Sequence, residues 1–171
     1  MRSLLFLCLF GLLALAGCKT LGDRSGRVDP DATIKVPFDP VPVQYIASQG
    51  TAQVTGKVAL TTSKGDVVAG GAELRLVPVA EYSRAVMKYR FQGRNAHFEK
   101  RQIAKLDPRY SQYMRTSRSD ARGSFVFKDV PSGEYFIYAT GTNKKDGSFL
   151  GLMETVKVGD GEHLRVDVDG V

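Results

Sequence analysis

Apolar and polar residues alternate in several short runs after residue 51, and this period of two predicts half-buried β-strands. In the first run, Val54 and Val58 face one side while Thr55 and Lys57 face the other. The runs cover residues 53–60, 72–78, 124–130, 134–139, 150–158 and 163–168. Each run has the length of a strand, so the pattern predicts a mainly β domain.

Turn-forming residues separate these runs. Gly70-Gly71, Pro131-Ser132-Gly133 and Gly159-Asp160-Gly161 each stand between two of them. Because only a short turn separates 124–130 from 134–139, we expect these two strands to pair as a hairpin. Short strands divided by Gly, Pro and Asp predict an antiparallel β-sandwich, rather than a sheet in which strands alternate with helices.

A segment without this alternation lies between Val79 and about Arg115, and we take it as a helical insertion at about 80–115. Residues 81–91 place apolar side chains at helical spacing and predict an amphipathic helix. Its apolar face carries Tyr82, Ala85, Val86 and Tyr89. Residues 95–106 predict a second, weaker helix, after which 113–117 is expected to rejoin the sheet.

The stretch from Asp120 to Tyr135 resembles the diagnostic stretch of carboxypeptidase regulatory-like domains: an acidic residue, a turn glycine, an aromatic strand, then Pro-x-Gly-x-Tyr. Gly56-Lys57-Val58 and Gly70–Leu74 resemble the start of the same pattern. The resemblance implies a transthyretin-like antiparallel β-sandwich of about seven strands, with the insertion between early strands. It also implies a noncatalytic role, because the zinc site of the parent enzymes belongs to a different domain.

The steric reason for this motif lies in three of its residues. Gly123 and Gly133 are expected to adopt positive φ at turns. Tyr135 is expected to bury its ring while its hydroxyl finds a polar partner.

The amino terminus has the form of an export signal, predicted over residues 1–17. Leu4 to Ala16 is an uncharged apolar run after Arg2, and it is short for a membrane-spanning helix, which needs roughly 20 residues. The run ends in Leu15, Ala16, Gly17 and Cys18, which resemble a bacterial lipobox at every position. The resemblance implies that Cys18 carries diacylglycerol, and each buried methylene contributes about 0.8 kcal/mol to anchoring. The alternative, a permanent transmembrane helix, stays open.

Lys19 follows the lipidated position, which resembles lipoproteins sorted to an outer membrane. We therefore expect attachment to a bacterial membrane, on the periplasmic face of the outer membrane. Residues 18–50 then contain four prolines and several glycines, and they predict a Pro-rich tether before the sandwich at 51–171. Alternatively, residues 34–36 or 43–46 pack along the edge of the sandwich as an extra strand.

The insertion carries the charge of the chain. Residues 80–122 contain eleven Lys and Arg against four Asp and Glu, within a chain of net charge +6. Basic side chains among aromatic ones suit anionic polymers. The candidate binding surface comprises Arg84, Lys88, Arg90, Arg94, Lys100, Arg101, Tyr82 and Tyr89. In the competing interpretation, the aromatic residues cover the sandwich and the basic residues are merely solvated.

Little in the chain predicts catalysis. His97 and His163 are the only histidines and lack the spacing of a zinc site, and Cys8 lies within the signal. The aspartates of the turns could hold calcium, but turn formation also accounts for them. We therefore expect no enzyme activity, no cofactor and no metal site.

The resulting hypothesis is a noncatalytic, membrane-anchored lipoprotein that binds a protein partner or an anionic cell-wall or lipid component. Export makes nucleic acid an unsuitable partner. Two alternatives remain: a structural accessory subunit of an envelope or secretion assembly whose exposed sheet edges pair with partners, and a hydrolase that uses a histidine.

Overall fold

The computed structural model of the protein describes residues 28–62, 65–68, 70–93, 96–97, 102–142 and 149–169. The predicted signal peptide, its lipobox and Cys18 lie outside these residues, as do Arg94, Lys100 and Arg101. No helix in the described ranges has both the length and the apolar character needed to cross a membrane.

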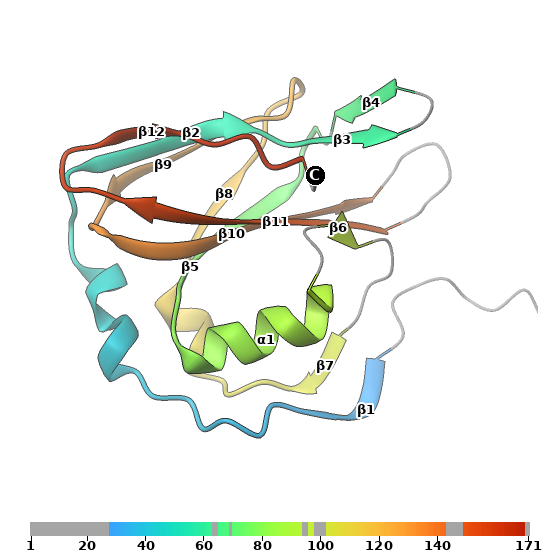
Figure 1. Ribbon diagram of the computed structural model, residues 1–171, viewed down its shortest axis with the longest axis vertical. Helices are drawn as coiled ribbons and strands as arrows, with labels where there is room; N and C mark the ends of the chain where they lie inside the picture. The colour runs from blue at the N-terminus through green and yellow to red at the C-terminus, as the bar shows by residue number, and fades with distance from the viewer. Residues whose placement is uncertain are drawn as a thin grey trace, which may run out of the picture.

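Two sheets face each other in a β-sandwich (Figure 1). The larger, antiparallel sheet has the order β6-β11-β10-β5-β8, and the smaller has the order β12-β2-β9, in which β12 and β2 run parallel. The larger sheet comprises β6 (Ala96–His97), β11 (Phe149–Val158), β10 (Gly133–Thr142), β5 (Glu73–Pro78) and β8 (Arg115–Arg118). The smaller comprises β12 (His163–Arg165), β2 (Ala52–Lys57) and β9 (Ser124–Val130).

The remaining elements surround the sandwich. Strands β3 (Ala59–Thr62) and β4 (Gly65–Val68) form a hairpin, and β1 (Val28–Thr33) pairs in parallel with β7 (Gln102–Lys105). The helical elements are η1 (Val41–Ala47), α1 (Glu81–Phe91) and η2 (Tyr110–Tyr113). The mainly β sandwich with a helix between early strands is thus confirmed.

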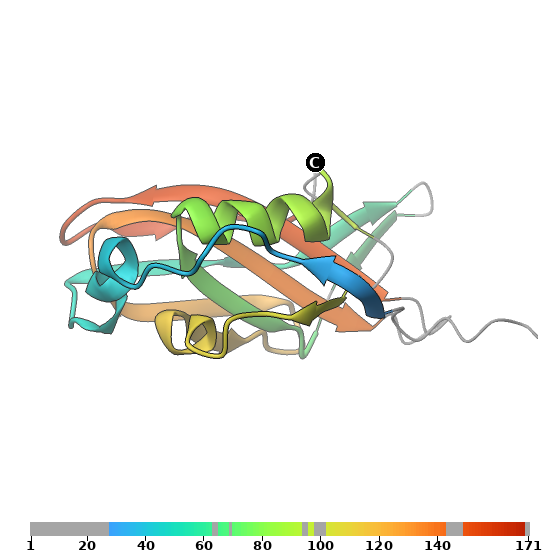
Figure 2. The same cartoon turned by 90° about the horizontal axis from the view of Figure 1, so that it is seen from below.

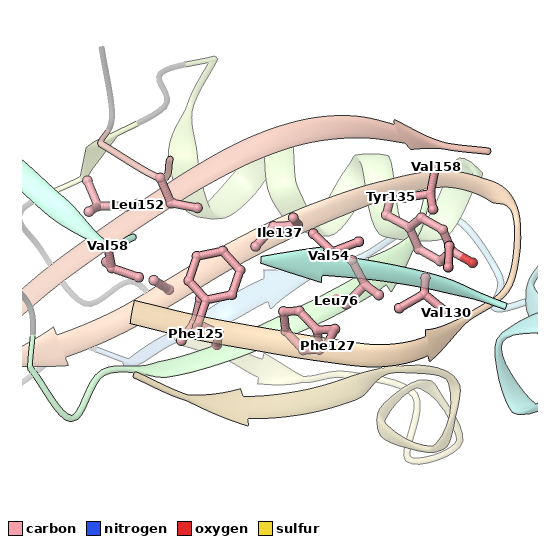
Figure 3. Packing of buried hydrophobic residues seen from close by; sticks show 14 of the residues in the cluster. Val54, Val58, Leu76, Phe125, Phe127, Val130, Tyr135, Ile137, Leu152 and Val158 are labelled. Carbon is pink, nitrogen blue, oxygen red and sulfur yellow. The ribbon is translucent and has the colours of Figure 1, made fainter. Parts of the chain in front are cut away.

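The core between the sheets follows from the alternation in the sequence. Alternate residues of a strand point to opposite faces, so one face of each sheet is apolar and is removed from water. Val54 of β2, Leu74 and Leu76 of β5, Ile137 of β10 and Leu152 of β11 are all fully buried there (Figure 3).

The predicted helix at 81–91 is confirmed with the same bounds as α1. At its start, the Ser83 hydroxyl accepts a hydrogen bond from the Ala80 N–H (2.8 Å), which would otherwise lack a partner. At its end, Gln92 adopts the left-handed conformation (φ 52°) and stops the helical hydrogen bonding. Tyr82 and Val86 are buried as the helical face predicts.

The second helix, predicted over 95–106, is wrong. The described part of that segment forms β6 and β7 instead. β7 lies beside β1, and β6 pairs with β11. Backbone groups that pair with distant strands do not need a helix, and periodicity within one short segment does not reveal such partners.

The predicted hairpin of 124–130 with 134–139 is also wrong, because β9 and β10 belong to different sheets. β9 pairs with β2, whereas β10 pairs with β5 and β11. Asp129, near the end of β9, has a φ of 55°, and the chain crosses to the other sheet after Val130. The crossing is held by the Tyr135 hydroxyl, which donates to the Pro131 carbonyl at 2.7 Å. The predicted burial of Tyr135 and its polar partner are thus confirmed.

Glycine serves different purposes at the two positions of the motif. Gly123 has a φ of 79°, so its predicted conformation is confirmed. Gly133 is not among the positive-φ glycines, and the prediction for it is wrong. A Cβ at Gly133 would lie 2.7 Å from the Tyr45 hydroxyl oxygen, so the close approach of the Tyr45 side chain to the backbone explains this glycine.

The predicted tether is wrong for residues 28–50, which pack on the domain. Val43 and Ile46 of η1 are 3% exposed, so the alternative of a packed segment is correct, although it forms a 3-10 helix rather than a strand. Proline fits the start of this helix, because the N–H groups of the first helical residues have no acceptor within the helix.

Arg115 fastens this segment to the sandwich. Its guanidinium donates to the carbonyls of Ile46 (3.0 Å), in the last turn of η1, and Ser48 (2.7 Å), directly after it. It also donates to the carbonyls of Lys128 (2.9 Å) and Asp129 (2.7 Å) at the end of β9. One side chain from β8 thereby joins three parts of the chain.

A candidate binding layer over the larger sheet

α1, η2 and the segment before η1 cover the outer face of the larger sheet (Figure 2). Three edge-on ring contacts organise this cover: Phe38 with Tyr82 (5.2 Å between centroids), Phe38 with Tyr110 (5.9 Å) and Tyr82 with Tyr110 (5.0 Å). We call the buried residues of this cover, together with the buried residues of the sheet beneath it, the aromatic layer. It comprises Phe38, Val43, Val77, Tyr82, Val86, Met87, Phe91, Tyr110, Phe136 and Tyr138.

The tyrosines of the predicted binding surface belong to this layer or to its margin. Tyr82 is 5% exposed, and its hydroxyl accepts a hydrogen bond from the Asp107 N–H at 2.8 Å. Tyr89 is half-buried and packs against the layer. The structure therefore places Tyr82 in the interior, as in the competing interpretation, and it cannot meet a ligand at the surface.

The basic side chains of α1 lie in different environments. Arg84 is exposed and forms an ion pair with Glu134 at 3.2 Å, and Lys88 is exposed. Arg90 is half-buried, and its guanidinium carbon lies 5.6 Å from the centre of the Tyr138 ring. Ion pairs between described residues include Arg84 but neither Lys88 nor Arg90.

Arg109 is committed to local contacts. Its guanidinium pairs with Asp107 at 2.8 Å, donates to the Phe38 carbonyl at 3.3 Å and lies 5.5 Å from the centre of the Phe38 ring. Hydrogen bonds from Arg109 lower the pKa of the Asp107 carboxyl. This pair fastens the loop before η2 to the segment before η1.

Arg75 of β5 joins Arg90 at the Tyr138 ring. Its guanidinium carbon lies 5.7 Å from the ring centre, and it donates to the Tyr138 hydroxyl at 3.3 Å. It also pairs with Glu73. Burial lowers the pKa of Arg75, but Tyr138 and Glu73 outweigh it and raise that pKa, so Arg75 stays charged. We call Arg75, Arg90, Tyr110 and Tyr138 the arginine–tyrosine cluster.

Three members of this cluster, Arg75, Tyr110 and Tyr138, lie outside the candidate binding surface that the sequence predicted. Arg75 and Tyr138 are direct cross-strand partners, so only the register of β5 and β10 brings them together. Tyr110 comes from η2, which the sequence did not predict. The alternation of β5 did indicate that Glu73 and Arg75 share the face opposite the core, but it gave no sign that α1 would bring Arg90 to it.

Two atoms of the cluster are buried without a hydrogen-bond partner: Nε of Arg90 and the hydroxyl oxygen of Tyr110. Tyr110 is 4% exposed, and burial raises the pKa of its hydroxyl far above the usual range, against the opposing charges of Arg90 and Arg75. Leaving a buried polar group unpaired costs about 1–3 kcal/mol, and it is uncommon in native proteins.

The described ranges contain no group of three or more His, Cys, Asp and Glu that could hold a metal ion. His163 is exposed at the start of β12, and His97 lies in β6. Neither the turn aspartates nor these histidines gather into a site there.

The fold resembles that of a solved structure from Pseudomonas aeruginosa, described as a candidate carbohydrate-binding protein. The TM-score is 0.63 with 22% sequence identity, and the similarity covers 77% of this chain and 97% of the other. No protein-family model matches the chain, and no curated protein matches it. At this identity the likeness shows the sandwich fold.

Proposed function

We propose that this protein is a noncatalytic lipoprotein, held to a bacterial outer membrane by a lipid on Cys18, which binds an anionic component of the envelope. The lipobox of residues 15–18 supports the anchor. The motif from Asp120 to Tyr135, with Gly123 at positive φ and a hydrogen-bonded Tyr135, supports membership of the carboxypeptidase regulatory-like family.

The observation that carries the binding proposal is the excess of basic side chains over the aromatic layer. Lys88 is exposed, Arg84 has an exposed ion pair, and among the described residues Arg75 pairs with the Glu73 carboxylate while Arg90 is in no ion pair. An exposed ion pair is worth at most about 1 kcal/mol, so an anionic ligand can displace Glu134 from Arg84 at little cost. A positive surface also speeds the encounter with an anionic polymer.

The structural neighbour favours a carbohydrate among the anionic components. Envelope polysaccharides and peptidoglycan carry carboxylates on a sugar backbone. The acid groups of such a polymer would meet the arginine and lysine side chains on this face of the domain, whereas the aromatic side chains of the layer lie buried beneath them.

The packed segment at 28–50 limits the distance between the domain and the bilayer. β1 begins at Val28, so nine residues, 19–27, separate it from Cys18. Nine residues span at most roughly 30 Å. In this proposal the sandwich lies close to the membrane, near the polymers attached to it.

Mass spectrometry tests the anchor. Protein extracted from native membranes is expected to carry diacylglycerol on the Cys18 sulfur, and Cys18→Ser is expected to move the protein into the soluble fraction. A bare sulfur on membrane-associated wild-type protein contradicts this part of the proposal.

Cosedimentation of the full chain, in detergent, tests binding. We expect it to pellet with peptidoglycan sacculi and not with insoluble neutral dextran, and to be released by high salt because the attraction is electrostatic. Arg84→Gln with Lys88→Gln is expected to weaken binding several-fold. The control, Lys128→Gln with Arg165→Gln, removes equal charge from the smaller sheet. Equal binding to dextran, or equal loss in the control, contradicts the proposal.

A further inference from the structure

Two hydrogen-bond donors of the arginine–tyrosine cluster lack an acceptor. Nε of Arg90 carries a hydrogen that it can only donate, and the Tyr110 hydroxyl can donate one as well. The Tyr110 hydroxyl is within electrostatic reach of both Arg90 and Arg75, whose charges act to lower its pKa. Geometry links the two donors through Tyr138, because the Arg90 guanidinium carbon lies 5.6 Å from the centre of the Tyr138 ring, and Tyr138 and Tyr110 belong to the same buried cluster.

One acceptor group could satisfy both donors. A carboxylate has two oxygens, each able to accept more than one hydrogen bond, and guanidinium groups bind carboxylates in a matching planar geometry. The guanidinium carbons of Arg75 and Arg90 lie 5.7 Å and 5.6 Å from the centre of the Tyr138 ring, so this ring brings both guanidinium groups to one place.

The charge of the region matches a single negative charge. Arg75 and Arg90 contribute two positive charges, and Glu73 offsets one of them. A monoanion completes the balance, whereas a doubly charged phosphate would exceed it. The Arg75 side chain is 29% exposed, so the cluster reaches solvent at Arg75 although both donor atoms are buried.

We propose that the arginine–tyrosine cluster binds a carboxylate of the ligand, with Arg90 Nε and the Tyr110 hydroxyl as its donors. The inference rests on the proposed function, since it assigns the anionic component a carboxylate and a site. The carboxylate could belong to an acidic sugar or to the end of a peptide, and the same chemistry recognises either.

Titration of the full chain with small probes tests this site. We expect D-glucuronate or N-acetyl-D-alanine to bind, the first indicating a sugar acid and the second a peptide end, while D-glucose does not bind. Binding is expected to shift the NMR signal of the Arg90 Nε–H, which reports on the site in the wild-type protein. Tighter binding of inorganic phosphate than of either carboxylate overturns the inference.

Variants separate this site from the surface of α1. Arg90→Gln and Tyr110→Phe are each expected to weaken carboxylate binding about tenfold, the effect of one lost charge-assisted hydrogen bond. Arg165→Gln and Tyr135→Phe are the matched controls, and they are expected to leave it unchanged. If sacculi bind but neither carboxylate shifts the Arg90 signal, this inference fails and the proposed function stands. If sacculi do not bind at all, the proposed function fails.

Discussion

The two faces of the larger sheet bury very different sets of residues. The inner face meets β2 and β9 in an aliphatic and aromatic core, in which the hydroxyl of Tyr135 has its partner (Figure 3). The outer face meets α1 and η2 in the aromatic layer (Figure 2). There, Arg75 and Arg90 both lie at the Tyr138 ring, and the Tyr110 hydroxyl is buried without a hydrogen-bond partner.

This difference separates stability from binding within one small domain. A core without unpaired polar groups gains the full benefit of burial, and it holds both sheets in register. A layer that contains charged and unpaired groups gains less free energy from burial. Binding sites commonly contain such groups. We therefore expect substitutions in the sandwich core to act on folding, and those in the arginine–tyrosine cluster to act mainly on binding.

The largest effect is expected in the sandwich core. Leu76→Ala removes a fully buried side chain and should lower the free energy of unfolding by about 2–5 kcal/mol, through lost burial and a residual cavity. Chemical denaturation measures it. The control is Val126→Ala, at an exposed position of β9, which should change the free energy of unfolding by less than about 0.5 kcal/mol. Similar losses in both variants would refute the location of the core.

An intermediate effect is expected at the join between the two regions. Arg115→Lys cannot reach the carbonyls of η1 and β9 together, and should cost about 2 kcal/mol. Amide hydrogen exchange should accelerate at residues 43–48 more than within β10. Arg122→Lys in the β8–β9 turn is the control. Uniform acceleration across the domain would mean that Arg115 is not specific to η1.

The smallest changes in the free energy of unfolding are expected at two buried tyrosines. Tyr135→Phe loses a hydrogen bond to Pro131 and should cost about 1 kcal/mol. Tyr110→Phe removes an unpaired hydroxyl and should be neutral or stabilising by up to about 1 kcal/mol in protein without ligand. Denaturation of both variants under one condition measures the difference. A loss in Tyr110→Phe as large as in Tyr135→Phe would mean that the Tyr110 hydroxyl has a partner, and would weaken the case for the site.

Local patterns were enough to predict much of this fold. The alternation at Leu74 and Leu76 identified β5 and its buried face, and the spacing of Tyr82 and Val86 identified α1 with its bounds. Both patterns arise within one element, where the geometry of a strand or helix directly sets which side chains share a face.

Partners distant in the chain could not be predicted in this way. The assignment of β9 and β10 to different sheets depends on β2 and β5, and the β1–β7 pair joins segments about seventy residues apart. The candidate site has the same origin, since Arg75, Arg90, Tyr110 and Tyr138 come from four different elements.

The sequence by itself determined α1, the lipobox of the predicted anchor and the sandwich strands β2, β5 and β9 to β12, because each depends on neighbours within a few residues. Only the tertiary structure decided which sheet each strand joins, that residues 28–50 pack on the domain, and that two arginines meet at Tyr138. The physical reason is that pairing and burial depend on surfaces that exist only after distant segments have come together.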